Sequence, residues 1–313
     1  MIKENLAAID LGSNSCRLKI TDGKGKMLFR KAVTTKLGEG LQGNGKFSDE
    51  AWERGLRCLS EYAQIMREYE VGHYRAITTA SCRMAANGEE FVKAVREITG
   101  ISLEIIDAGE EAMLNLRGAR LNASADAEYI AVYDLGGGST EVTLAKNSDN
   151  PNILYTLSIP WGARTAAEAF DLLEYDEIKA QKLAAEISKY MNDFMQQSQF
   201  AEYRDSCECL ATSSTPLRLL SMVKNFGSYD RDLADGAEAN VSEIDKVIEK
   251  VRKMNLTELS ESAYIGVNRA PIIQAACVIF QTIYRILGVN KIKASLKSAQ
   301  DAIIEDLVRK WQN

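Results

Sequence analysis

Two short segments of this chain contain the residues whose types and spacing could do chemistry. Residues 7–15 read Ala-Ala-Ile-Asp-Leu-Gly-Ser-Asn-Ser, and residues 131–139 read Ala-Val-Tyr-Asp-Leu-Gly-Gly-Gly-Ser. Each is an apolar strand that runs into an aspartate, a glycine-rich turn and a second strand. Glycine permits positive φ and close approach, so the N–H groups of such a turn can all face one anion. The repetition predicts two related halves whose turns hold a phosphate chain between them.

Either turn alone is also typical of an ordinary hairpin, in which glycine and asparagine merely permit the turn. Two such turns, each opening one half of the chain, indicate duplicated structure instead. Hydrolysis of a terminal phosphoryl group needs its charge held, a water aimed in line and a carboxylate beside that water. The candidate phosphate ligands are Gly12, Ser13, Asn14, Ser15, Gly136, Gly137, Gly138 and Ser139, together with Arg83, which can form an always-charged bidentate clamp.

Two further sequence motifs indicate a resemblance to a known protein family. Residues 78–87 read Thr-Thr-Ala-Ser-Cys-Arg-Met-Ala-Ala-Asn, and residues 105–114 read Ile-Ile-Asp-Ala-Gly-Glu-Glu-Ala-Met-Leu. With the two glycine turns, they strongly resemble the exopolyphosphatase and guanosine pentaphosphate phosphohydrolase family, over nearly all of residues 6–146 and more faintly to the end. The resemblance implies that Glu111 orients or deprotonates the attacking water, with Arg83 beside it.

The same resemblance implies a divalent cation held by Asp134 and Glu141, with Asp10 as a further member of the cluster. Mg²⁺ suits such a site because it keeps several waters and binds carboxylates together with phosphates. Taken singly, each residue has another interpretation. Glu111 could be a first-turn glutamate favoured by the helix dipole, Arg83 a structural ion-pair partner, and Glu141 a solvated strand residue.

The second half departs from the family pattern at two places. Residues 211–215 read Ala-Thr-Ser-Ser-Thr where the family has a Gly-x-Ser-Gly-Thr loop, and residues 295–302 lack an aspartate, two glycines and an arginine of another family motif. Side chains at such positions would crowd a backbone that lies close to a ligand. These changes motivate an alternative function, a catalytically impaired sensor or scaffold that binds phosphate compounds.

Composition narrows the class of protein. The chain has 313 residues, 46% of them hydrophobic, and a net charge of −6, which argues against a general nucleic-acid binder. We read no signal sequence and no apolar run long enough to span a membrane, and we expect a cytoplasmic protein without nucleic-acid or membrane partners. One histidine, His73, excludes a site built on two histidine ligands within one chain.

Two other features of the sequence do not indicate a functional site. The six cysteines are scattered, and we interpret most of them as small core residues in a reducing compartment. Residues 40–46 fit the start of a nucleotide-binding P-loop, but Phe47 stands where a serine or threonine must reach Mg²⁺.

The elements that must position these residues follow from the periodicity of the chain. The predicted strands are 6–10, 15–20, 26–36, 74–79, 103–106, 129–134, 140–146, 153–160, 209–212 and 291–295; the predicted helical regions are 49–69, 89–99, 110–120, 165–197, 242–254, 270–287 and 298–312. Three strands followed by alternating helices and strands occur twice. This order, with the resemblance, predicts an α/β protein of two actin-like (ribonuclease-H-like) domains, each a mixed five-stranded sheet flanked by helices, with a cleft between them.

The predicted domains are residues 1–123 and 124–299, with a C-terminal helix from about residue 300 to 313 packing back on the first. The resemblance implies a Mg²⁺-dependent phosphatase that releases terminal orthophosphate from inorganic polyphosphate or guanosine pentaphosphate, and a possible homodimer. An actin-like sugar or acetate kinase is a third possibility, which the changed 211–216 loop disfavours.

Overall fold

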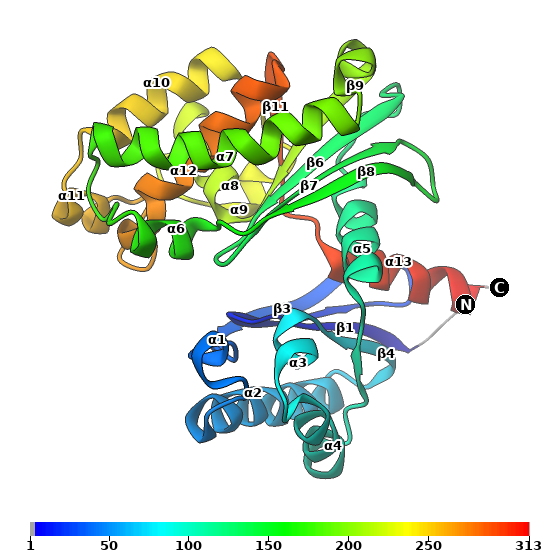
Figure 1. Ribbon diagram of the computed structural model, residues 1–313. Helices are drawn as coiled ribbons and strands as arrows, with labels where there is room; N and C mark the ends of the chain where they lie inside the picture. The colour runs from blue at the N-terminus through cyan, green and yellow to red at the C-terminus, as the bar shows by residue number, and fades with distance from the viewer. Residues whose placement is uncertain (1–3, 313) are drawn as a thin grey trace. The chain divides into compact units, whose positions relative to one another are not determined.

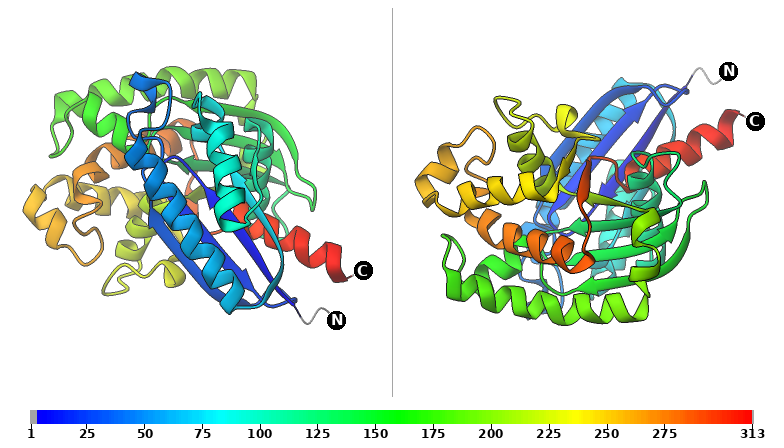
Figure 2. Two further views of the ribbon diagram at one scale, coloured as in Figure 1. Left: turned by 90° about the horizontal axis from the view of Figure 1, so that it is seen from below. Right: turned by 90° about the horizontal axis from the view of Figure 1, so that it is seen from above.

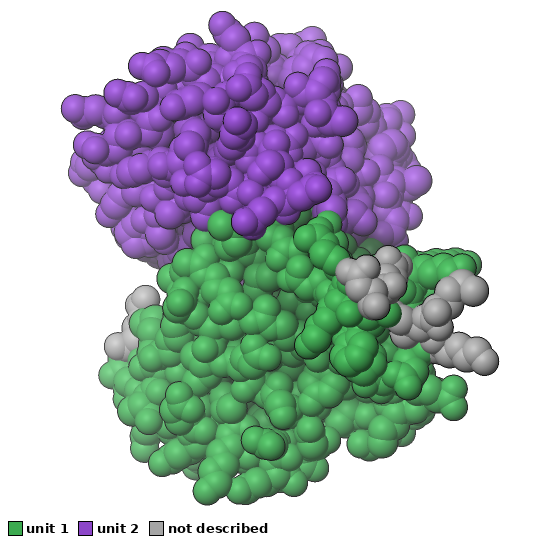
Figure 3. Space-filling model, turned by 90° about the vertical axis from the view of Figure 1, so that its right-hand side faces the viewer, with its two compact units in different colours: residues 1–118, 299–313 green, residues 119–298 purple. Residues whose placement is uncertain are grey.

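The structure is a computed structural model that describes residues 4–312, and it divides into two compact units (Figure 3). Unit 1 contains the chain up to Gly118 and the segment that begins at Ala299. Unit 2 contains Ala119–Ser298. The first boundary therefore lies a few residues before the predicted one.

Unit 1 is built on a five-stranded mixed sheet with the strand order β3-β2-β1-β4-β5 (Figure 1). Its strands are β1 (Asn5–Leu11), β2 (Ser15–Thr21), β3 (Met27–Thr34), β4 (Val71–Thr78) and β5 (Leu103–Ile105). The first three strands are antiparallel neighbours, and β4 and β5 add to β1 in parallel. The antiparallel hairpin between β1 and β2 places the first glycine turn at one end of the sheet.

Helices cover both faces of this sheet. They are α1 (Leu41–Asn44), α2 (Asp49–Glu68), α3 (Ala80–Met84), α4 (Gly88–Thr99), α5 (Ala108–Arg120) and α13 (Ala299–Gln312). Ser48 caps the start of α2, because its side chain accepts the Ala51 N–H at 3.2 Å. Helices α2 and α4 lie on one face of the sheet and α13 on the other (Figure 2). The apolar core beneath α2 and α4 is separate from a smaller one, to which α5 and α13 contribute.

Unit 2 is built on a six-stranded mixed sheet with the order β10-β11-β9-β6-β7-β8. Its strands are β6 (Tyr129–Leu135), β7 (Thr140–Lys146), β8 (Asn152–Ile159), β9 (Cys207–Thr212), β10 (Glu238–Asn240) and β11 (Lys291–Ser295). The prediction of five strands was wrong here, because β10 adds to the edge of β11. That strand has three residues, Glu-Ala-Asn, and carries no apolar alternation that could have signalled it.

The helices of unit 2 surround one long apolar helix. They are α6 (Ala163–Ala169), α7 (Glu177–Gln197), η1 (Phe200–Glu202), η2 (Arg204–Ser206), α8 (Ser214–Val223), α9 (Arg231–Ala234), α10 (Val241–Arg252), α11 (Leu256–Glu261) and α12 (Ala270–Leu287). Helix α12 packs against α6, α7, α8, α10 and α11. It is long and apolar enough to cross a membrane by length and composition alone, but 78% of it is buried inside the structure, which is typical of a core helix.

The predicted helical region 165–197 is two helices. It breaks because Asp176 caps a new helix, accepting the Lys179 N–H at 2.9 Å. The short α3 and the ten-residue α8 were not predicted. Each begins two residues after a strand. Helix α3 carries Arg83, and α8 follows Thr212, which is paired with Asp134.

Candidate active site

The first glycine turn joins β1 to β2 and is closed by its own backbone. The Gly12 N–H donates to the Ser15 carbonyl at 3.0 Å. The carbonyls of Ser13 and Asn14 accept the N–H groups of Gly38 (2.8 Å) and Lys36 (3.0 Å), which follow β3. Among the residues that the structure describes, no acceptor takes the N–H groups of Ser13 and Asn14. Two donors of this turn are therefore available to an anion.

The second glycine turn, between β6 and β7, repeats this arrangement within unit 2. The Gly136 N–H donates to the Ser139 carbonyl, again at 3.0 Å. The carbonyls of Gly136 and Gly137 accept N–H groups from Ala163 and Arg164, both at 2.9 Å, at the start of α6. Within residues 4–312, the N–H groups of Gly137 and Gly138 have no acceptor.

Each turn packs against a glycine from another segment, and the sequence analysis identified neither of these two glycines. A Cβ atom on Gly38 would lie 3.0 Å from Cβ of Ser13, and one on Gly162 would lie 2.6 Å from the carbonyl carbon of Gly137. Gly38 follows the third strand of unit 1, as Gly162 follows the third strand of unit 2. Extending the internal repeat past the third strand would have found them.

The reason for glycine in the turns themselves differs from the prediction. None of Gly12, Gly136, Gly137 and Gly138 is among the described residues with positive φ. A Cβ atom on Gly136 would instead lie 2.9 Å from the Ser139 carbonyl oxygen, whereas Gly137 and Gly138 face open space. Close approach, and not left-handed backbone, is what this turn requires.

The two turns differ in the residue opposite their aspartate. Asp10 is paired across the strands with Arg17, and their side chains form an ion pair at 3.5 Å. Asp134 is paired with Glu141 in the corresponding position. Hydroxyl groups of Ser139 (2.6 Å) and Ser158 (3.1 Å) donate to Glu141. Like charges directly opposite each other are unfavourable, which makes the second turn the better place for a cation.

No group of three or more histidine, cysteine or acidic side chains that could hold a metal ion occurs among residues 4–312. The carboxylates of Asp134 and Glu141 come together by register, in unit 2. Asp10 lies in unit 1, where it acts on Glu111. The donor set at the second turn is thus two carboxylates and nearby hydroxyls, all hard oxygen ligands of the kind that Mg²⁺ accepts.

The structure brings Arg83 and Glu111 together, both in unit 1. Arg83 lies on α3 and Glu111 in the first turn of α5. Nη2 of Arg83 donates to Oε2 of Glu111 at 3.0 Å, and Nη1 donates to the Ile106 carbonyl at 2.6 Å. The ion pair leaves 26% of the arginine side chain and 28% of the glutamate side chain exposed. Asp107 caps α5, accepting the Glu110 N–H at 2.8 Å, so the helix start that carries Glu111 is fixed.

Burial raises the pKa of Glu111 above the ordinary glutamate value. Arg83 and a hydrogen bond with Thr79 act in the opposite direction, and the nearby charge of Asp10 adds to the increase. A carboxylate whose pKa is raised is a better proton acceptor than a surface glutamate. The neighbouring Glu110 has a different environment, since it pairs with Arg75 at 2.5 Å.

These features suit the handling of a phosphoryl group, and comparison with known proteins agrees. The model of the Ppx/GppA phosphatase family matches residues 18–310. This chain belongs to the Ppx/GppA phosphatase family. The bifunctional 3-dehydroquinate synthase/phosphatase of Fusobacterium nucleatum is 32% identical over 206 residues, which are 60% of this chain and 31% of that protein. The chain thus spans less than a third of that relative's length.

Solved structures of this family have the same fold. A Ppx/GppA family member from Aquifex aeolicus matches with a TM-score of 0.83 at 21% identity, covering 99% of both chains. An exopolyphosphatase from Cytophaga hutchinsonii matches with a TM-score of 0.84 at 20% identity, covering 98% of both. The prediction of two actin-like domains with mixed sheets is confirmed, with the corrected strand number in unit 2.

The segments in which this member departs from the family pattern lie beside Asp134. Thr212 is paired with Asp134 across β6 and β9, and Ser295 is paired with Thr212 across β9 and β11. The following Ser213 has φ 82° and ψ −179°, a conformation that essentially only glycine adopts at low cost. Its Oγ is buried and hydrogen-bonds to no described group. The strain thus falls on Ser213, within the segment 211–215 that departs from the Gly-x-Ser-Gly-Thr pattern expected from the resemblance.

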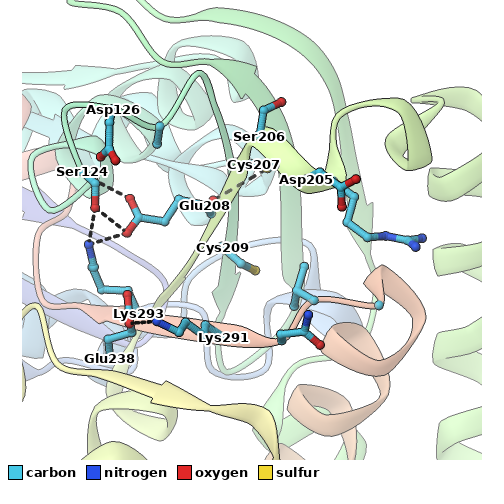
Figure 4. A pocket seen from close by; sticks show the side chains of 15 residues that line it. Ser124, Asp126, Asp205, Ser206, Cys207, Glu208, Cys209, Glu238, Lys291 and Lys293 are labelled. Atoms are coloured by element: carbon cyan, nitrogen blue, oxygen red, sulfur yellow. Dashed lines mark hydrogen bonds and ion pairs between the residues drawn. The ribbon is translucent and has the colours of Figure 1, made fainter.

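A pocket of about 430 Å³ in unit 2 does not coincide with these residues. It lies where β9 and β11 begin, whereas Thr212 and Ser295 end those strands. Its lysines are already engaged: Lys293 pairs with Glu208 and donates to Ser124 at 3.0 Å, and Lys291 pairs with Glu238 at 3.0 Å (Figure 4). None of the predicted site residues lines it.

Proposed function

We propose that this Ppx/GppA family member is a metal-dependent phosphohydrolase that releases terminal orthophosphate from inorganic polyphosphate, from guanosine pentaphosphate, or from both. The observation that carries the proposal is the Arg83–Glu111 pair, at 3.0 Å. A carboxylate of raised pKa beside a fixed guanidinium provides a proton acceptor next to a group that binds phosphate oxygens.

The proposed roles follow from the contacts of each group. Glu111 accepts a proton from the attacking water or orients it, and Arg83 binds an oxygen of the transferred phosphoryl group. The N–H groups of Ser13 and Asn14, and of Gly137 and Gly138, donate to phosphate oxygens. Because the carbonyls of both turns are already bonded to backbone N–H groups, these donors need no rearrangement before a phosphate binds.

Asp134 and Glu141 would hold a divalent cation, with the hydroxyl groups of Ser139 and Ser158 fixing Glu141. When bound, Mg²⁺ would neutralise charge on the phosphate oxygens. Two carboxylates that face each other across adjacent strands support this assignment, because an intervening cation removes their repulsion. With two protein carboxylates, the remaining positions would be filled by water and phosphate oxygens.

Phosphate release from each substrate, with and without Mg²⁺, tests the proposal. Glu111→Gln should lower kcat at least about 100-fold. Glu110→Gln is the matched control, one residue away on the same helix turn, and should retain activity. The proposal is overturned if purified protein with Mg²⁺ releases no phosphate from either substrate, or if the Glu111 variant equals the wild type.

The segment after β11 favours a second function, a sensor that binds phosphate compounds without turnover. The Leu296 N–H donates to Asp235 at 2.8 Å, and Asn122 donates to Ser295 Oγ at 3.0 Å. These groups are already hydrogen-bonded within unit 2. Stabilisation by guanosine pentaphosphate or polyphosphate in a thermal unfolding assay, without phosphate release, would favour the sensor, and saturable turnover would exclude it.

A further inference from the structure

Two cysteines lie directly behind the first glycine turn and have no part in the proposed chemistry. Cys16 is the second residue of β2 and follows Ser15, the last residue of the turn. Cys58 lies on the buried face of α2. Both belong to the core between α2 and the sheet, where Cys16 is fully buried and Cys58 is 4% exposed.

A contact of Tyr62 places the turn of α2 that carries Cys58 next to Cys16. The Tyr62 hydroxyl donates to the Cys16 carbonyl at 2.8 Å, so this point of α2 lies against this point of β2. Cys58 precedes Tyr62 by four residues and therefore shares its helix face, and aromatic side chains on a helix lean back toward that preceding turn. Both thiols belong to the same buried core cluster of unit 1, and each acts on the pKa of the other.

The two thiols differ in reactivity. Burial raises the pKa of Cys16, whereas the hydrogen bond from Cys16 lowers the pKa of Cys58. The charges nearest Cys58 are Glu61, which opposes this decrease, and Lys31, which adds to it. The thiolate is the form that reacts with oxidants, so Cys58 is the sulfur that attacks the peroxide first and Cys16 is the resolving partner.

We propose that Cys16 and Cys58 form a reversible disulfide when the protein is exposed to a peroxide, and that this bond displaces the first glycine turn. The Cys58 thiolate attacks one peroxide oxygen, breaking the O–O bond and giving a sulfenic acid and one water. The Cys16 sulfur then attacks the Cys58 sulfur, forming the S–S bond and releasing the sulfenic oxygen as a second water. The two thiols lose two electrons to the peroxide in total.

The short S–S bond of a disulfide explains why the first glycine turn would move. A disulfide brings the sulfurs to about 2.05 Å, far closer than two free thiols can lie. Cys16 must move toward α2, and the adjacent Ser15 carbonyl, which holds the Gly12 N–H, moves with it. A shift of about 1 Å in a positioning group can cost 100-fold in rate. This loss of activity rests on the proposed phosphatase function, whereas the disulfide itself does not.

To test this proposal, the reduced protein is treated with hydrogen peroxide, and its disulfides are mapped by peptide mass spectrometry. We expect a peptide pair that joins Cys16 to Cys58 and lacks two hydrogens, at least a tenfold loss of phosphate release, and recovery with a thiol reductant. Cys58→Ala should form no such pair and keep its activity after treatment. Cys207→Ser is the matched control, removing another cysteine, and should respond like the wild type. Cys16→Val provides a second variant if Cys58→Ala does not fold.

The outcomes separate the two proposals. Absence of the Cys16–Cys58 pair overturns the disulfide, whatever the activity. Formation of the pair without loss of phosphate release overturns displacement of the turn. If the untreated protein releases no phosphate, the proposed function fails, and a cross-linked pair with increased resistance to denaturant still supports the disulfide.

Discussion

Gly162 stands so close to the second glycine turn that a Cβ atom on it would lie 2.6 Å from the carbonyl carbon of Gly137. The contact is with backbone, which cannot rotate away as a side chain could. In unit 1 a Cβ atom on Gly38 would meet Cβ of Ser13 at 3.0 Å, a milder contact of the same kind. Both turns therefore pack against a glycine in the segment that follows the third strand of their unit.

Gly162→Ala should lower the free energy of unfolding by about 1–3 kcal/mol, because the turn or α6 must shift to admit a methyl group. Gly138→Ala is the control, since its Cβ would meet no atom within 4 Å. That variant should change the free energy of unfolding by less than about 0.5 kcal/mol and still lose activity, because its methyl group would enter the open space beside the N–H groups that we propose bind phosphate. Urea unfolding measures the stability of both variants, and a phosphate-release assay measures their activity. Equal stability of the two variants would contradict the role of Gly162.

The pH dependence of activity should report on Glu111. Because its pKa is raised by burial, the acid limb of kcat/KM should lie above the ordinary glutamate value. Arg83 lowers this pKa, so Arg83→Gln should move the limb to still higher pH in addition to slowing the reaction. Arg75→Gln, which removes the partner of Glu110, should leave the limb in place. A limb that does not move in the Arg83 variant would exclude Glu111 as the titrating group.

The same pKa shift predicts how stability varies with pH. The folded state favours protonated Glu111, so the stabilisation is fully present below the unfolded-state pKa of about 4.3 and is lost as pH rises through the folded-state pKa. Glu111→Gln stays neutral and should be more stable than the wild type at pH 7, with the difference disappearing at low pH. Thermal unfolding across this range tests the sign. A variant less stable than the wild type at pH 7 would show that the Arg83 ion pair outweighs burial.

Much of this site could be predicted from the sequence because its residues lie in local motifs. The strand-turn-strand pattern gave both glycine turns, and the motif at residues 105–114 pointed to Glu111, whose helix start is fixed locally by Asp107. The supporting glycines could not be found this way, since Gly38 and Gly162 act across hydrogen bonds to turns far back in the chain. Strand β10 depends on pairing with β11, which no local signal encodes.

Ser213 offers a test of strain in the segment that departs from the family pattern. Ser213→Gly should raise the free energy of unfolding by about 1 kcal/mol, because glycine adopts this backbone without strain and removes a buried hydroxyl that lacks a partner among the described residues. Ser214→Gly is the matched control, since Ser214 begins α8 with ordinary helical backbone. It should be neutral or destabilising. Equal effects of both substitutions would mean that Ser213 is not strained.

The residues opposite the two aspartates predict opposite effects of removing one charge. Asp134→Asn ends the repulsion with Glu141 and should raise the free energy of unfolding in a chelator by about 0.2–1 kcal/mol. Asp10→Asn removes the ion pair with Arg17 and should lower it by a similar amount. Added Mg²⁺ should stabilise the wild type and the Asp10 variant more than the Asp134 variant, because the last has lost a ligand. Equal stabilisation of all three proteins by Mg²⁺ would place the cation elsewhere, and a destabilised Asp134 variant in chelator would show that its carboxylate is held by other contacts.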